Sequence, residues 1–208
     1  MVPIEQALDR ILDEDPSLAD LVRPWPDERR VLRWIGPEDK ARGYGITPIE
    51  LPGRAGTLWA GSTPGRRDWS RLPAQLGGLR EAGIDQLVCL LSQGDLERLD
   101  RQAPFRTSLE ARFGDGLLHV PMGDYGLPTS VDVFEAALER VDEALFAGAD
   151  VLAHCGAGCG RAGTFCCCML VRAGYDTAEA VATYRAVRGC GPERPLQVAL
   201  IEWVRRRF

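Results

Sequence analysis

Residues 150–164, DVLAHCGAGCGRAGT, are the stretch that decides the fold of this 208-residue chain. Residues 151–153 are apolar and predict a short buried strand, which three closely spaced glycines follow (Gly156, Gly158 and Gly160). Glycine destabilises the interior of a helix or a strand by roughly 0.5–1 kcal/mol relative to alanine. The glycines therefore predict a curled loop over residues 155–161, the cysteine loop, and a helix that begins at Arg161.

A curled loop that leads into a helix N-terminus binds anions, because consecutive backbone N–H groups converge on one point. In that positive field the thiolate of Cys155 is stabilised, and the guanidinium of Arg161 can bind a phosphate through two parallel hydrogen bonds. A thiolate beside a phosphate cradle indicates phosphoryl transfer through a covalent cysteinyl-phosphate. The predicted phosphate-binding residues are those of the loop: Gly156, Ala157, Gly158, Cys159, Gly160 and Arg161.

The segment HCGAGCGRAGT (154–164) resembles the signature loop of the cysteine-dependent protein phosphatases, which is His-Cys, five residues, Arg and then usually Ser or Thr. His154 and Thr164 are supporting residues of this pattern. The resemblance implies an α/β protein tyrosine phosphatase-like fold, a central parallel or mixed sheet of four to five strands flanked by helices. It places the cysteine loop at the carboxyl end of a central strand, where open α/β sheets bind ligands. The implied chemistry uses no metal and no cofactor.

One position departs from the family pattern. Ala162 stands where relatives carry Ser or Thr, whose hydroxyl steadies the thiolate as the cysteinyl-phosphate breaks down. We therefore expect slow hydrolysis of that intermediate, visible as burst kinetics.

A second candidate motif is GDYGLPTS (123–130), which follows a predicted strand. In the family that the loop resembles, a loop of this kind carries the general-acid aspartate, here Asp124. The chemistry needs such a group, because the departing substrate oxygen must be protonated. Taken alone, Asp124 is more simply a turn residue. Asp132 is a weaker competitor, because it suits the first turn of a helix.

Two further segments narrow the resemblance, which spans about residues 55–208. A predicted helix, a buried strand (84–91) and S-Q-G-D-L (92–96) resemble the cyclin-dependent kinase-associated phosphatase group of the dual-specificity branch. The triad Glu193-x-Pro195-x-Gln197 resembles the family segment in which a proline begins the last helix. Gln197 there either helps to place the hydrolytic water or is an ordinary surface residue.

The resemblance implies a phosphomonoester hydrolase that acts on phosphoproteins. Its expected target is phosphotyrosine, with phosphoserine and phosphothreonine as additional targets. The cysteine loop lacks the lysines of phosphoinositide-specific relatives, which favours a phosphorylated protein or peptide as the partner. The alternative is a pseudophosphatase, a phosphate-recognition module with little or no turnover, which Ala162 mildly favours. A structural or redox protein built on its cysteines is a more distant alternative.

Composition and charge exclude some partners and compartments. The net charge is −5 and no basic run precedes Arg205, so nucleic acid is not an expected partner. No run of about twenty apolar residues is present, so no membrane span is expected. The acidic, amphipathic N-terminus is unlike a signal peptide, and we expect a cytoplasmic protein.

The seven cysteines are not spaced as a disulfide framework, which favours a reducing compartment. Cys159 and Cys89 are candidate partners of Cys155 on oxidation, because low-pKa thiolates oxidise most readily. A zinc site built from His154, Cys155, Cys159 and the triplet at 166–168 is a minor alternative, because the chain contains no CxxC pair.

We expect an N-terminal helical extension (1–28), which either packs on the domain or docks a partner, and a dual-specificity-type phosphatase domain (29–208). Predicted strands are 30–36, 56–62, 84–91, 116–122 and 151–153. Apolar periodicity predicts helices from Pro3, over 68–82, 95–101, 106–113 and 130–146, after Arg161, from a Thr177 cap and from Pro195. His119 in the fourth strand is expected to be a sheet residue and not a catalyst.

Overall fold

The computed structural model describes residues 4–22, 45–66 and 68–208, and its centre is a five-stranded mixed sheet. The strand order is β1-β2-β5-β3-β4, with β1 antiparallel to β2 and the other pairs parallel. The strands are β1 Ile46–Ile49, β2 Leu58–Gly61, β3 Ile84–Cys89, β4 Leu117–His119 and β5 Asp150–His154. The predicted α/β sheet is confirmed. β1 was not predicted, and the strand expected at 30–36 lies outside the described residues.

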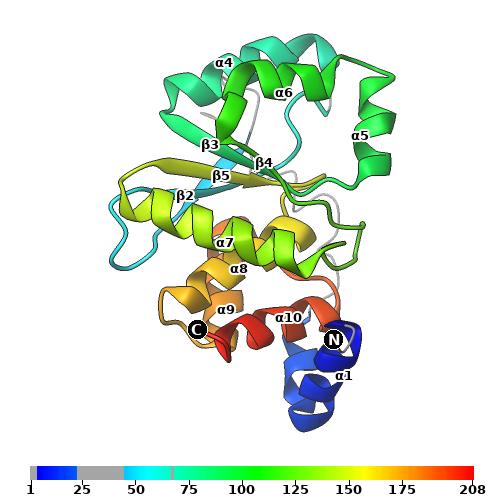
Figure 1. Ribbon diagram of the computed structural model, residues 1–208, viewed down its shortest axis with the longest axis vertical. Helices are drawn as coiled ribbons and strands as arrows, with labels where there is room; N and C mark the ends of the chain where they lie inside the picture. Colours follow the sequence, from blue (N-terminus) through cyan, green and yellow to red (C-terminus); the bar gives the residue numbers. More distant parts are fainter. Residues whose placement is uncertain (1–3, 23–44, 67) are drawn as a thin grey trace.

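Helices cover both faces of this sheet (Figure 1). One layer holds α4 Leu72–Glu81, α5 Gln93–Asp100 and α6 Phe105–Phe113; the other holds α7 Val131–Phe146, α8 Gly160–Arg172, α9 Thr177–Arg188 and α10 Pro195–Arg205. On β5, Leu152 packs into the first layer, whereas Val151 and Ala153 pack into the second. Parallel strands buried on both faces read as continuous apolar runs, which is why β3 and β5 were visible in the sequence.

Several element ends differ from the prediction. The helix expected at 68–82 is a 3-10 turn, Trp69–Arg71, followed by α4. β3 ends at Cys89 and not at residue 91, and a capping box of Ser92 and Asp95 begins α5 directly after Leu91. The N-cap of α9 is Asp176 and not Thr177, since its carboxylate accepts a hydrogen bond from the Glu179 N–H.

The N-terminal helices pack on the rest of the chain. α1 Ile4–Glu14 and the 3-10 helix Pro16–Leu21 lie against α10, as Figure 1 shows for α1. Leu8, Ile11 and Leu18 are buried in the same core cluster as α8 and α10. Of the two roles expected for this segment, packing is therefore the one observed. None of the helices within the described ranges has the length and apolar character that a membrane crossing requires.

Candidate active site

The cysteine loop begins at the carboxyl end of β5, the middle strand of the sheet. β5 lies between β2 and β3, and the loop leads directly into α8, which begins at Gly160. A central strand end that feeds a helix N-terminus is the position at which open α/β sheets bind anionic ligands. The fold thus places Cys155 where the sequence predicted it.

Residues from the segment after β2 hold the first half of the loop. The Thr63 hydroxyl donates to the Cys155 carbonyl at 2.9 Å, and the Thr63 N–H donates to the Gly156 carbonyl at 3.2 Å. The Arg66 guanidinium donates to the same Gly156 carbonyl at 2.9 Å.

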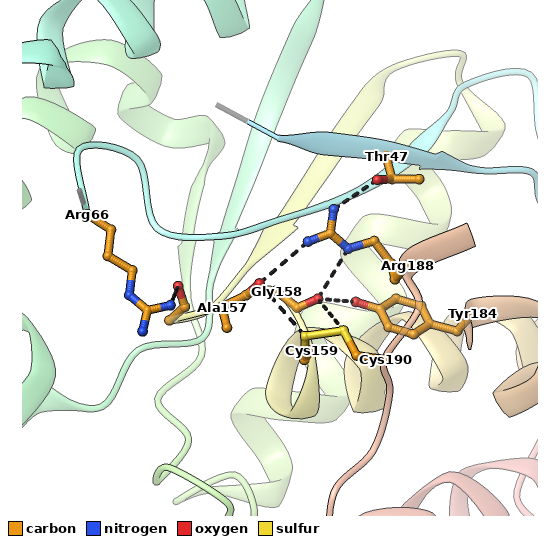
Figure 2. The surroundings of a disulfide bond; sticks show 9 residues. Thr47, Arg66, Ala157, Gly158, Cys159, Tyr184, Arg188 and Cys190 are labelled. Atoms are coloured by element: carbon orange, nitrogen blue, oxygen red, sulfur yellow. Dashed lines mark hydrogen bonds between the residues drawn. A yellow bond between two sulfur atoms is a disulfide. The ribbon is translucent and has the colours of Figure 1, made fainter. Parts of the chain in front are cut away.

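Two residues of α9 hold the second half (Figure 2). The Tyr184 hydroxyl donates to the Gly158 carbonyl at 2.8 Å, and Arg188 Nε donates to it at 3.3 Å. Arg188 also donates to the Ala157 carbonyl at 3.5 Å and to the Thr47 hydroxyl at 2.8 Å. The loop carbonyls are thus bonded to residues outside the loop. Because a trans peptide sets each N–H opposite the preceding carbonyl, the loop amides are left to face the pocket.

Gly158 is required by its conformation and by its neighbours. Its φ is +74°, in the region that favours glycine, and an added Cβ would lie 2.6 Å from the Gly61 carbonyl oxygen. The curled loop that the glycines predicted is present at residues 155–161. The sequence reasoning missed Tyr184 and Arg188, for which the sequence gives no local signal.

A disulfide joins Cys159 to Cys190, in the turn after α9. This pairing corrects two expectations: the cysteines are not all free thiols, and the partner of Cys159 is Cys190 and not Cys155. The two half-cystines are 31 residues apart in sequence, and the return of α9 along α8 brings them together. Sequence spacing does not reveal such a contact.

We predict that the double substitution C159S/C190S lowers the free energy of unfolding by about 3–4 kcal/mol, because it releases a loop of 31 residues in the unfolded chain. Denaturant unfolding with and without dithiothreitol measures this. The reductant should lower the stability of the wild type to that of the variant and leave the variant unchanged. A wild type that does not respond to the reductant would contradict the prediction.

Arg161 is held by partners from two other segments. Its side chain is 5% exposed, and its guanidinium lies 2.7 Å from Asp95 Oδ2 and 3.0 Å from Asp124 Oδ1. Its Nη1 also donates to the Met122 carbonyl at 3.2 Å. The two predicted residues Arg161 and Asp124 are therefore brought together, and Asp132 lies elsewhere, in the first turn of α7.

Asp95 is a site residue that the sequence reasoning missed. Burial raises the pKa of its carboxyl, but hydrogen bonds from Arg161, Arg98 and Ser92 outweigh this effect and lower the pKa to about 2. An ionised Asp95 fixes the fork of Arg161 in one orientation. A signal existed in the sequence, because Asp95 stands in the first turn of a helix that follows a buried strand in the same sheet as β5.

The supporting residues His154 and Thr164 are both buried, and neither side chain lines the pocket. The His154 side chain is fully buried, and burial lowers the pKa of its imidazole to about 3. The Thr164 hydroxyl donates to the Gly160 carbonyl at 2.8 Å, one turn back in α8, and so does not substitute for a hydroxyl at position 162. The ring of His119 lies 2.9 Å from the Leu91 carbonyl, as expected of a sheet residue.

Of the two roles expected for Gln197, that of an ordinary surface residue is wrong, because the side chain is fully buried. The role in placing the hydrolytic water stays a prediction, and Gln197 is not among the residues that line the pocket. Its Nε2 donates to the Gly126 carbonyl at 3.0 Å, and its Oε1 accepts from the Glu193 N–H at 2.8 Å. Gln197 therefore ties the Asp124 loop to the turn before α10.

Cys89 is fully buried, and burial raises the pKa of its thiol to about 12. It stays a thiol, as does the triplet at 166–168 in the core. The minor zinc alternative has no support among the described residues, where no cluster of three potential ligands occurs.

The catalytic candidates of the cysteine loop and of the Asp124 loop line one pocket of about 880 Å³. Cys155, Arg161, Asp124 and Asp95 lie in it together with Glu193, which no prediction had placed there. Its remaining lining residues are Thr63, Arg66, Trp69, Leu91, Arg98, Leu99, Gln102, Tyr125, Gly156, Ala157, Cys159 and Gly160.

A family model described as "Polymorphic toxin system, DSP-PTPase phosphatase" matches residues 65–175, slightly more than half of the chain. The chain belongs to this family of phosphatases. The domain is accordingly that of a dual-specificity protein phosphatase, an enzyme of the class that the cysteine loop resembles. The expected dual-specificity branch is confirmed. No curated protein matches the chain.

Solved structures share the phosphatase fold. The kinase associated phosphatase, crystallised with its catalytic-site cysteine replaced by serine, is 19% identical over 79% of this chain and 95% of its own, with a TM-score of 0.68. Tk-PTP in its active form is 24% identical over 78% of this chain and 98% of its own, with a TM-score of 0.59. Human DUSP28 is 21% identical over 77% and 94%, with a TM-score of 0.52. At such identities the likeness concerns the fold.

Proposed function

We propose that this phosphatase hydrolyses phosphomonoesters on proteins through a cysteinyl-phosphate intermediate. The observation that carries the proposal is the meeting of Cys155, Arg161 and Asp124 in one pocket, with Arg161 Nη2 3.0 Å from Asp124. Cys155 and Arg161 lie six residues apart at the two ends of the cysteine loop, whereas Asp124 comes from a separate loop 31 residues before Cys155. Their convergence supplies a nucleophile, an anion clamp and a proton donor.

In the first step, the Cys155 thiolate attacks phosphorus, so that an S–P bond forms and the P–O bond to the substrate breaks. The protonated Asp124 carboxyl gives its proton to the departing oxygen. In the second step, water attacks the phosphorus, and the Asp124 carboxylate accepts a proton from that water. The S–P bond then breaks to return the thiolate and release inorganic phosphate. Arg161 and the loop amides bind the phosphoryl oxygens in both steps.

The substrate class that we propose is a phosphorylated protein or peptide carrying phosphotyrosine, with phosphoserine and phosphothreonine as further substrates. Trp69, Leu91, Leu99 and Tyr125 give the pocket apolar walls that suit an aromatic side chain. No lysine lies in the cysteine loop, and a lysine-free loop suits a phosphorylated protein better than a phosphoinositide.

The test is to trap the intermediate. Enzyme turning over a phosphotyrosyl peptide is quenched in acid, digested and analysed by mass spectrometry. We expect a phosphate on the peptide that contains Cys155, and none on the corresponding peptide of Cys155→Ser. Turnover by the wild type without a phosphorylated Cys155 would overturn the mechanism. If the wild type binds phosphate but never turns over, the chain is instead a phosphate-recognition module.

Ala162→Ser is predicted to raise the steady-state turnover by up to about tenfold, if an added hydroxyl contributes a hydrogen bond to a charged thiolate. The fully buried Ala162 is the residue directly after Arg161, and Thr164 is bonded to Gly160 instead. Stopped-flow kinetics should show a burst for the wild type that shrinks in the variant. Ala162→Gly, which adds no hydroxyl, is the control. A linear wild-type time course would contradict the prediction.

We also propose that residues 1–28 form a helical extension on a phosphatase domain of residues 29–208. The kinase associated phosphatase is matched over 95% of its own chain by 79% of this one, which leaves room for such an extension. The family match begins only at residue 65.

A further inference from the structure

Glu193 is a carboxylate inside the pocket to which the proposed mechanism gives no role. It is half-buried and lies against the N-terminus of α8, where an added Cβ on Gly160 would collide with Glu193 Oε2. Its backbone is fixed by the 2.8 Å hydrogen bond from its N–H to the buried Gln197. The chain thus leaves a side chain out at Gly160 and holds Glu193 beside the amides that cradle the anion.

The charges around Glu193 oppose its ionisation. Asp124 faces it from the loop before α7, and Asp95 and the Cys155 thiol line the same pocket. Arg161, a cation that acts on Glu193, is already paired with the two aspartates at 2.7 and 3.0 Å. Within the described ranges, the Glu193 carboxylate itself has no ion pair within 4.0 Å.

Two arginines, Arg161 and Arg194, reduce this opposition without removing it. Arg194, the chain neighbour of Glu193, lies over the Tyr125 ring at 5.2 Å, and Arg66, which also lines the pocket, donates to the Gly156 carbonyl. Burial, followed by repulsion from Asp124, raises the pKa of Glu193 to about 7, against the lowering effect of Arg161 and Arg194. A neighbouring group of like charge has this effect generally.

An incoming phosphoryl group brings two more negative charges. An ionised Glu193 would repel it, whereas a neutral carboxylic acid can donate its O–H to a phosphoryl oxygen. We propose that Glu193 is a substrate-binding residue that acts in its protonated form, donating a hydrogen bond to the bound phosphoryl group. The proton comes from solvent as the anion enters and returns to solvent as it leaves. This inference rests on the proposed function of the same pocket.

The consequence is an anion affinity that depends on pH. If only the protonated form binds, the apparent dissociation constant should rise about tenfold between about pH 6 and about pH 8, as the competent fraction falls. The direction follows from the raised pKa, because the carboxyl is mostly neutral below about 7 and mostly ionised above it.

The experiment compares Cys155→Ser with the double variant C155S/E193Q, using sulfate as the probe. Sulfate remains a dianion over this range, and the serine background removes both turnover and the titration of the thiol. Tryptophan fluorescence reports binding, since Trp69 lines the pocket. We expect the roughly tenfold loss of affinity in C155S and a flat profile in C155S/E193Q, because glutamine keeps a donor that does not ionise. C155S/D132N, altered at an exposed carboxyl, should behave as C155S.

Equal pH dependence in C155S and C155S/E193Q would overturn the inference, and so would an absence of sulfate binding at every pH. The proposed function fails separately, if the sulfate titration is as expected but the wild type turns over no phosphopeptide.

A second measurement guards against a poorly folded variant. The unfolded chain ionises Glu193 from about pH 4.5 upward, whereas the folded chain does so only near 7, so ionisation costs stability as the pH rises through that window. The melting temperature of Glu193→Gln, relative to the wild type, should therefore increase from about pH 4.5 to about pH 7 and then level off. A constant difference would contradict the raised pKa.

Discussion

Replacing Cys155 with serine is expected to lower kcat for p-nitrophenyl phosphate by at least about 10⁴-fold, because the loss of a nucleophile removes the covalent pathway entirely. A serine hydroxyl has the shape of the thiol and is slightly smaller, but it is far less ionised near neutral pH. No second thiol replaces Cys155 among the described residues: the hydroxyls of the pocket are those of Thr63, which donates to the Cys155 carbonyl, and Tyr125, and the other lining groups are carboxylates, arginines, amides, apolar side chains and a disulfide sulfur.

The same variant should still bind oxyanions. The cradle consists of loop amides, fixed through Thr63 and Arg188, together with Arg161, and none of these depends on the sulfur of Cys155. The measurement is a pair of assays near pH 6, hydrolysis of p-nitrophenyl phosphate and binding of vanadate, on wild type and variant. Loss of both in C155S would indicate a collapsed loop and not a missing nucleophile.

The matched control is Cys168→Ala, in the core on α8 and outside the pocket. It should lose stability but keep kcat, because it removes a buried thiol without touching the anion cradle. If the cysteines had a structural or redox role instead, C168A would reduce function as much as C155S does. Turnover retained in C155S would overturn the covalent mechanism.

The centre of the site could be predicted because its information is local. Strand, glycine curl and helix occupy residues 150–172 without interruption, and the apolar strand that carries them is buried on both faces. Asp124 was proposed from the resemblance, which places a general-acid aspartate on the loop after the strand predicted at 116–122, and the chemistry only explains why such a group is needed. Taken alone, the segment around Asp124 indicates no more than a turn.

The groups that were missed act through contacts distant in sequence. Asp95 precedes Arg161 by 66 residues, and Tyr184 follows Gly158 by 26. Whether such residues meet depends on the order of the strands and the return path of the helices, which periodicity does not specify. The burial of Gln197 was left open for a similar reason, because which face of a helix is buried depends on what packs against it.

β1 was missed for a reason of its own. It is a four-residue edge strand that contains Pro48, and a proline within a run argues against a strand unless it lies at an edge. Only the three-dimensional arrangement shows that Thr47 on this strand accepts the hydrogen bond from Arg188 and so helps to hold the cysteine loop.

Asp124→Asn is expected to lower kcat for a phosphotyrosyl peptide by about 10²–10⁴-fold, because asparagine cannot protonate the departing tyrosyl oxygen. The effect on p-nitrophenyl phosphate should be much smaller, since p-nitrophenolate is stable enough to leave without a proton. Asparagine keeps the size of Asp124, whose side chain is 67% exposed and reaches Arg161 at 3.0 Å. The loss should therefore reflect proton transfer and not folding.

The decisive quantity is the ratio of kcat for the two substrates, compared between wild type and Asp124→Asn. Asp132→Asn, eight residues on and exposed in the first turn of α7, serves as control and should leave the ratio unchanged. Removal of Asp124 also frees one side of Arg161, so KM for both substrates should fall or stay constant while kcat for the peptide collapses. Equal losses of kcat on both substrates would mean that Asp124 positions Arg161 and is not the proton donor. If the ratio of kcat for the two substrates changes in Asp132→Asn instead, the proton donor is Asp132, the weaker candidate from the sequence.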